Sequence, residues 1–182
     1  MKPIHIIPLA DGGASGPALN LLESLAAALA RIFRTPCQIR PEVFDVTFAL
    51  DSNRRQYHST AILQGLERHC DPDARILGVT GCDLFVPVLT FVFGEAQLDG
   101  NCATVSLARL KEEAYGLPPR DDLLRERLLK EAIHELGHTF GLRHCADWRC
   151  VMTSSHAVER LDVKGAEFCA GCRKAVLTGS EP

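Results

Sequence analysis

Short apolar runs rich in β-branched residues predict strands, and these runs alternate with helical segments along the first half of the chain. The expected strands are residues 2–8, either 37–40 or 43–48, 75–80, 88–93 and 103–107. The turn-rich sequence at residues 99–101 separates the last two strands, which could pair as an antiparallel edge. The pattern therefore favours an α/β fold built on a mixed sheet.

Apolar residues spaced three and four apart predict the helices. The expected helices are residues 18–33, 57–70 and 123–140. An apolar stripe on the third helix is expected to face the sheet, and it consists of Leu129, Ile133, Leu136 and Phe140. His134 and His138 lie on nearly the opposite side of this helix, and Gly141 ends it and lets the chain turn sharply. From there on we expect mostly loop, with one short helix after Cys169.

Length and composition fit one globular domain. The chain has 182 residues, of which 46% are hydrophobic and 24% charged, and no repeat or linker divides it. We therefore expect a single domain over residues 1–182. The formal net charge of −3 gives no general attraction to nucleic acid or to an anionic membrane. No apolar run reads as a membrane span or a secretory signal, so we expect a cytoplasmic location.

The sequence His134-Glu135-Leu136-Gly137-His138 forms the pattern HExxH on the third predicted helix. Residues four apart share one helix face, so both imidazoles can bind a single zinc ion. Zinc lowers the pKa of a bound water toward about 7, and Glu135 can take the proton of that water as a general base. The alternative interpretation is an exposed polar helix face that carries two histidines by chance.

Gly141 and His144 extend this pattern to HExxHxxGxxH. The glycine permits a bend that returns a third imidazole to the metal, and three protein nitrogens leave the open position that catalytic zinc needs. At these residues the chain resembles the metzincin clan of metallopeptidases. That clan also has a methionine beneath the metal, in a loop after the third histidine. Met152 fits this position, and the alternative is a methionine that only fills the core.

Eight cysteines need an explanation in a chain expected in a reducing compartment, where clustered cysteines indicate metal or redox chemistry. Four are scattered and are expected to be small buried hydrophobic residues: Cys37, Cys70, Cys82 and Cys102. The other four crowd into the last quarter of the chain: Cys145, Cys150, Cys169 and Cys172. Two cysteine pairs, the second spaced C-x2-C, predict a closed four-cysteine zinc site with a structural role. Disulfides, or a redox dithiol in the second pair, are the alternatives.

The combined pattern of HExxHxxGxxHC, then C-x-M, then CxxC resembles the archaemetzincins, and residues 79–107 are also similar to that family. The resemblance implies an α/β fold, a compact single-domain metzincin-like sandwich with a mixed twisted sheet and an active-site helix. It implies two zinc ions per chain, a catalytic zinc on His134, His138 and His144 and a structural zinc on the four late cysteines. We expect an N-terminal α/β part, residues 1–141, and a mostly irregular, zinc-held C-terminal part, residues 142–182.

Hydrolysis of peptide bonds is the leading hypothesis for function, and a short chain with few insertions favours small peptides, as in an aminopeptidase. In metzincins the peptide lies along an exposed edge strand above the active-site helix. We assign residues 88–96 to that edge, although a buried strand fits the apolar sequence equally well. Two other functions stay open: a catalytically silent zinc-binding interaction module, which has no need of Glu135, and a hydrolase of a non-peptide amide.

One feature of some metzincins is missing. They place a tyrosine shortly after the methionine, whereas this chain has only Tyr57 and Tyr115, both upstream. A residue that stabilises the oxyanion must then come from elsewhere, and the candidates are His156 and Arg160.

Overall fold

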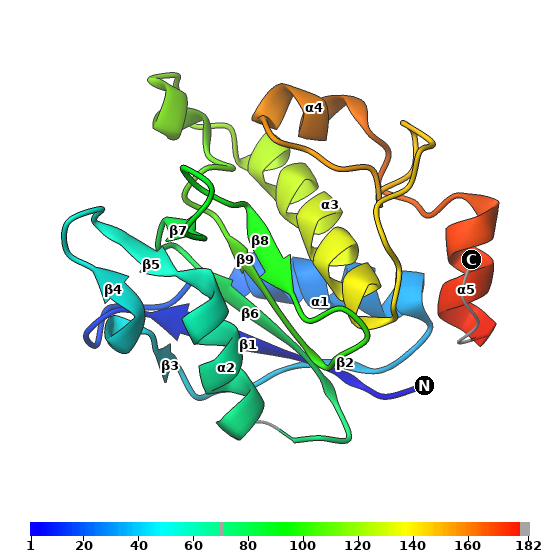
Figure 1. Cartoon of the computed structure of the whole chain (residues 1–182), viewed down its shortest axis with the longest axis horizontal. Coiled ribbons are helices and arrows are strands. Elements are labelled where there is room, and N and C mark those ends of the chain that lie inside the picture. The colour runs from blue at the N-terminus through cyan, green and yellow to red at the C-terminus, as the bar shows by residue number, and fades with distance from the viewer. Residues whose placement is uncertain (70, 179–182) are drawn as a thin grey trace.

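The structure, a computed structural model, describes residues 1–69 and 71–178. Its central sheet contains β1 (Ile4–Ala10), β2 (Cys37–Ile39), β3 (Phe44–Asp45), β6 (Arg75–Thr80), β8 (Gly94–Ala96) and β9 (Cys102–Ser106). The strand order is β2-β1-β6-β9-β8, and β3 also pairs with β1 (Figure 1). Strand β8 runs antiparallel to β9, whereas the other pairs are parallel. The prediction of an α/β fold with a mixed sheet is confirmed.

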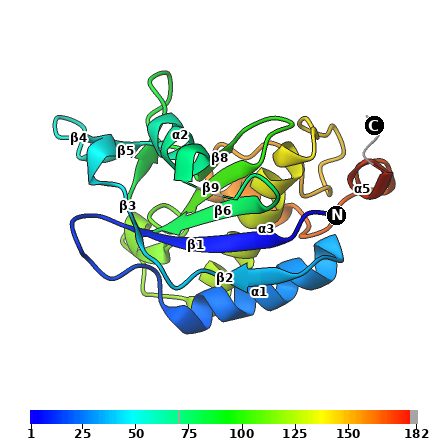
Figure 2. The same ribbon diagram turned by 90° about the horizontal axis from the view of Figure 1, so that it is seen from below.

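Helices cover both faces of this sheet. Helices α1 (Leu19–Phe33) and α3 (Asp121–Thr139) pack on one face, and α2 (Ser59–His69) packs on the other. Figure 2 shows α1 and α2 on opposite sides of the strands. Along β1, Ile4 and Ile6 enter the core beneath α1 and α3, whereas Leu9 enters the core beneath α2. Because both faces are covered, the central strands are almost entirely buried, which explains their continuous apolar sequences.

The second predicted helix starts later than expected. Residues 56–58 form β5 (Gln56–His58), which belongs to a small sheet with β4 (Leu50–Asp51) and β7 (Leu84–Phe85). The Tyr57 backbone N–H donates to the Asp83 carbonyl at 2.8 Å, so pairing with a distant segment replaces the first two residues of the predicted helix. The predicted end of this helix at Cys70 lies outside the described residues.

The strand predicted at residues 88–93 is wrong, because the edge strand β8 begins only at Gly94. Side chains occupy the carbonyls at the start of this stretch, whereas at its end the Val92 N–H donates to the Leu84 carbonyl and the Phe93 carbonyl accepts from the Ser106 N–H. The Arg54 guanidinium donates to the carbonyls of Leu89 and Thr90 at 2.8 and 3.0 Å, and the Gln56 amide donates to Thr90 at 2.9 Å. The stretch is therefore a loop held by side chains, and the assignment of residues 88–96 to the sheet edge is correct only for β8.

The C-terminal part contains one more helix than predicted. The expected helix after Cys169 is α5 (Ala170–Thr178), but α4 (Val158–Val163) was missed, and 3-10 turns occur at Thr47–Ala49 and Glu112–Tyr115. The C-terminal part packs on the same core as α1, since the Phe168 ring lies 5.7 Å from the Phe33 ring in an edge-on contact. Among the residues that the structure describes, no helix combines the length and apolar character needed to cross a membrane.

Candidate metal and catalytic site

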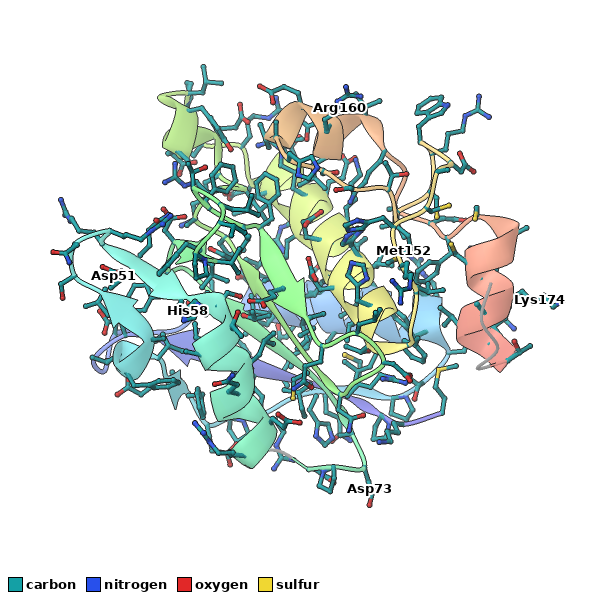
Figure 3. All side chains as sticks on the ribbon, viewed as in Figure 1. Asp51, His58, Asp73, Met152, Arg160 and Lys174 are labelled. Carbon is teal, nitrogen blue, oxygen red and sulfur yellow. The ribbon has the colours of Figure 1, made fainter. Side chains whose placement is uncertain are left out.

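The HExxH segment occupies the last turns of α3, and this part of the helix is buried on nearly all sides. The expected apolar stripe belongs to the main core, where Phe140 stacks on Phe33 of α1, but His134, on the other side, is also only 5% exposed. The chain after Gly141 folds back along the helix and covers that side, and Figure 3 shows Met152 of this segment beside α3. The side chains of His134 and His138, which the sequence pattern placed on a solvent-facing side of α3, are therefore covered by the chain segment that follows Gly141.

Gly141 turns the chain so that a third histidine reaches the first two. Its φ angle of 83° is in the left-handed region, which glycine adopts without steric cost. Its N–H donates to the His138 carbonyl at 2.9 Å, and the Leu142 N–H donates to the Gly137 carbonyl at 3.2 Å, so the helix ends in a tight αL turn. The ring of His144 then lies 5.3 Å from that of His134 and 5.1 Å from that of His138.

The hydrogen bonds of the first two rings fix which nitrogens carry protons. The Nδ1 atom of His134 lies 2.8 Å from the Val151 carbonyl, and the Nδ1 atom of His138 lies 2.6 Å from the Leu142 carbonyl. A carbonyl can only accept, so both Nδ1 atoms are donors and both Nε2 atoms present lone pairs in the neutral rings. These Nε2 atoms face each other at 3.1 Å. Two converging lone pairs repel unless a cation lies between them, so this donor set fits a zinc ion.

Burial is the largest cause of a lowered pKa at each of the three histidines. It lowers the pKa of His134 well below its usual value and lowers the pKa of His138 and His144 as well, and the charges of Lys164 and of neighbouring imidazoles add to the effect. Neutral imidazole is the form that binds metal. The possible ligand atoms of the three residues lie within 4.8 Å of one another.

Glu135, the predicted general base, lies beside this cluster and is only 6% exposed. Burial raises its pKa well above the usual range; the carboxylates of Glu131 and Glu95 add to the rise, and Lys164 opposes it. Gly94 of β8 makes room for this side chain. A Cβ atom on Gly94 would lie 2.6 Å from the Thr104 carbonyl oxygen and 2.7 Å from Cγ of Glu135, so glycine lets the edge strand approach both β9 and the carboxylate closely.

Met152 is fully buried and packs against α3 at Gly137. A Cβ atom on Gly137 would overlap the Met152 sulfur and lie 3.3 Å from the Phe168 ring. Glycine inside a helix costs about 1 kcal/mol relative to alanine, and its presence is explained by this contact. The structure thus places Met152 directly under the helix turn between the two histidines.

The four late cysteines form a second cluster, and their sulfur atoms lie within 4.8 Å of one another. The Cys145 and Cys169 sulfurs are 3.9 Å apart, and the Cys169 N–H donates to the Cys150 sulfur at 3.3 Å. A hydrogen bond from the Cys172 backbone lowers the pKa of Cys169, whereas burial raises the pKa of Cys150 and Cys172. All four are free thiols rather than disulfides, a donor set that fits zinc.

The scattered cysteines behave differently from the cluster. Cys102 is buried as expected, whereas Cys37 and Cys82 are only partly buried and pack against the two core clusters. Cys70 lies outside the described residues.

Three consecutive residues join the two clusters. Cys150 contributes a sulfur to the cysteine cluster, the Val151 carbonyl accepts the Nδ1 proton of His134, and Met152 packs under Gly137. In addition, the Cys145 N–H donates to the Met152 carbonyl at 3.0 Å. We therefore expect a change in the cysteine cluster to alter the orientation of His134.

Two cavities meet at the histidines. One, of about 370 Å³, lies between the loop at residues 89–93 on one wall and Ser154, Ser155 and His156 on the other. The second, of about 570 Å³, extends along β8 past Ala96 to Leu98. Gly94, His134, Glu135 and His144 line both cavities, so they form the two arms of one cleft.

The edge of β8 lines this cleft with free backbone groups. The Ser106 N–H donates to Phe93 and the Gln97 N–H donates to Cys102, so Glu95, midway between Phe93 and Gln97, also directs its N–H and carbonyl toward β9. Gly94 and Ala96 then direct theirs away from the sheet. Strand β8 is the last strand of the sheet within the described ranges, so an extended chain can pair with these groups.

Of the two proposed oxyanion residues, only His156 lines the same cavity as Glu135, whereas Arg160 lines a neighbouring cavity. The sequence interpretation missed Gly94 and the carbonyls of Val151 and Leu142, which orient the site without carrying a recognisable motif. The sequence did contain one signal of close packing at the site. Gly137 is a glycine inside a strongly predicted helix, and such a glycine indicates that another segment, here Met152, packs closely against it.

The model for peptidase family M54 matches residues 36–177 of this chain. The chain belongs to peptidase family M54. The archaemetzincin of Methanocaldococcus jannaschii is 46% identical over 138 residues, which cover 76% of this chain and 75% of that protein. The family resemblance seen in the motifs is therefore confirmed.

Two solved structures share this fold. The crystal structure of archaemetzincin from Archaeoglobus fulgidus, complexed with malonate, has a TM-score of 0.80 at 38% identity and covers 94% of this chain and 98% of that one. A zinc-dependent peptidase from Methanocorpusculum labreanum has a TM-score of 0.84 at 29% identity, covering 95% and 99%. The chain is thus a metallopeptidase-family protein whose histidine and cysteine clusters could each bind zinc.

Proposed function

We propose that this M54 chain is a zinc-dependent metallopeptidase that hydrolyses peptide bonds, with His134, His138 and His144 as ligands of the catalytic zinc. The observation that carries the proposal is the convergence of unprotonated imidazole nitrogens beside a buried carboxylate, at the free edge of a sheet. Three side-chain ligands leave a coordination position for the reactants, which a closed structural site does not do.

Bound zinc supplies Lewis-acid chemistry, which lowers the pKa of a water molecule and polarises the scissile carbonyl. Glu135 acts as the general base, which accepts a proton from the attacking water and passes it to the leaving amine. Burial and nearby carboxylates raise the pKa of Glu135, which increases its affinity for that proton. The carbonyls of Val151 and Leu142 hold His134 and His138 in the tautomer that directs Nε2 toward the metal.

Peptides are the proposed substrates because the cleft offers both a reactive centre and a backbone to pair with. An extended peptide that adds to β8 places its chain next to Gly94, and Glu135 lies against the same glycine. Small peptides, as taken by an aminopeptidase, are the form of substrate that the short chain favours. His156, on the opposite wall of the cavity, is proposed to donate a hydrogen bond to the developing oxyanion.

Cys145, Cys150, Cys169 and Cys172 are proposed to hold a second zinc with a structural role, which gives two zinc ions per chain. Four thiolates complete a tetrahedral site and leave no position for a substrate. We also propose that residues 1–182 form one domain, because the main core takes side chains from Ile4 through to Val176.

Digestion of a peptide library by zinc-saturated protein tests the proposed function, with Glu135→Gln as the control. Loss of the general base should lower the rate by about a hundredfold or more while the zinc stays bound, because Glu135 is not among the clustered ligands. Equal cleavage by both proteins would show that the activity does not use this base. No cleavage by the wild type, with zinc bound, would favour a silent zinc-binding module.

A further inference from the structure

A third cavity, which we call the α4 cavity, adjoins the catalytic cavity of about 370 Å³ and lies between the segment after Met152 and helix α4. It has a volume of about 310 Å³ and is lined by Trp148, Thr153, Ser154, His156, Arg160, Val163 and Lys164. Ser154 and His156 line the catalytic cavity as well, and their side chains contact each other at 3.2 Å. A peptide bound in the catalytic cavity therefore has the α4 cavity directly beside it.

The lining of the α4 cavity is basic. It includes an arginine, a lysine and a histidine, and none of the seven lining residues is acidic. The lysine, Lys164, is already paired, since its ammonium lies 3.1 Å from the Glu131 carboxylate and both side chains are buried. Arg160 is exposed on α4 (Figure 3), and none of the ion pairs found among residues 1–69 and 71–178 includes it. Its guanidinium thus supplies the positive charge that remains available to a ligand.

Apolar surface accompanies this charge. Trp148 is 57% exposed and Val163 is 67% exposed, and both line this cavity. The opposite arm of the cleft differs, because there an arginine, Arg143, lies in the same lining as the carboxylate of Glu95. The two ends of the cleft are therefore unlike in charge, and only the end at Arg160 has positive charge without a lining carboxylate.

We propose that the α4 cavity is a substrate subsite that binds a carboxylate of the peptide, with Arg160 as the anion-binding residue. The carboxylate comes from an acidic side chain or from the C-terminus of the peptide. Arginine suits this task because its planar guanidinium can donate two parallel hydrogen bonds to a carboxylate. Trp148 and Val163 cover the methylene groups that precede the charge. The inference rests on the proposed peptidase function and names its preferred substrates.

Trp148 provides a direct readout of binding, because it is the one tryptophan in the chain and it lines the subsite. Tryptophan-free peptides are titrated into zinc-loaded Glu135→Gln protein, which binds without cleaving, and Trp148 fluorescence is followed. The peptides come in matched pairs: glutamate against glutamine at each position, and free C-terminus against C-terminal amide. The pair that shows a preference identifies the source of the carboxylate.

We expect one charged peptide of these pairs to bind about three- to tenfold more tightly than its neutral partner, the range for a partly exposed charge-assisted pair. Adding Arg160→Gln should abolish this preference, and Arg160→Lys should retain part of it. Arg31→Gln is the matched control, because Arg31 is also an exposed arginine in the last turn of a helix, here α1. It should leave the preference unchanged.

Equal binding within every pair, or a preference that survives Arg160→Gln, would overturn the subsite. Cleavage by the wild type without any charge preference would do so too, while leaving the proposed function standing. Charge-dependent binding that requires Arg160, together with no cleavage by the wild type, would support the subsite and overturn the peptidase function instead.

Discussion

Replacing Cys150 with serine should weaken zinc binding at the histidine site, although Cys150 is not one of its ligands. The substitution removes one of four clustered sulfurs and so disrupts the proposed structural zinc site. The next residue, Val151, donates no side chain to the catalytic site, but its carbonyl accepts the Nδ1 proton of His134 at 2.8 Å. Loss of the cysteine-bound metal would release this segment from its anchor.

The expected magnitude follows from that single hydrogen bond. Leaving the buried Nδ1 donor of His134 without its partner costs about 1–3 kcal/mol. Loss of a hydrogen bond that orients a metal-bound histidine typically lowers metal affinity by about ten- to a hundredfold, or about 1.4–2.8 kcal/mol. The two ranges overlap. We therefore expect a ten- to hundredfold weaker affinity at the histidine site in Cys150→Ser.

Competitive chelation measures this effect, with zinc at the histidine site followed separately from the cysteine-bound zinc. Circular dichroism checks that the variant is folded. Cys37→Ser is the matched control, because Cys37 is a free cysteine in β2, at the far end of the sheet from β8. It should leave the affinity of the histidine site within about twofold of wild type, as expected for distant, uncoupled sites.

A folded Cys150→Ser protein that has lost its cysteine-bound zinc but keeps wild-type affinity at the histidines would refute the reasoning. The two clusters would then be independent, and the Val151 carbonyl would be held in place by the fold alone. The contacts to examine next would be those of Val151 itself, whose N–H donates to the Glu167 carbonyl at 2.9 Å.

Other predictions address metal content, the buried ion pair and the edge strand. Elemental analysis should give close to two zinc ions per chain, and one zinc that is unaffected by cysteine substitutions would remove the second site. Lys164→Met should cost about 3–5 kcal/mol in urea unfolding at pH 8, because it leaves the Glu131 carboxylate buried and unpaired. Burial raises the pKa of Glu131, and the charge of Lys164 opposes this rise. The loss of stability in Lys164→Met should therefore shrink as the pH falls and Glu131 takes up a proton. A loss that does not vary with pH would contradict the buried charge. Gly94→Ala should slow hydrolysis by about ten- to a hundredfold in a folded protein, because its methyl group would clash with the Thr104 carbonyl oxygen and the Glu135 side chain and so shift the edge strand and the base apart. A wild-type rate would show that the strand can yield.

The sequence by itself determined the parts of this protein that depend on local spacing. Helix geometry places residues four apart on one face, so HExxH already defined a pair of converging imidazoles on α3. The positions of His144 and the paired cysteines depend on short chain segments, and the structure brings these residues into the two expected clusters. The central strands were also predictable, since a strand covered on both faces has a distinctive continuous apolar sequence.

Only the tertiary structure decided the features that depend on distant segments. Pairing of Tyr57 with Asp83, and the hydrogen bonds from Arg54 to the loop at residues 89–90, replaced the first two residues of a predicted helix and a predicted strand. The same holds for the carbonyl of Val151 on His134, because backbone groups have no signature in a sequence. Local propensities are worth tenths of a kcal/mol per residue, whereas buried hydrogen bonds and packing are worth about 1 kcal/mol or more each, so long-range contacts prevail where the two conflict.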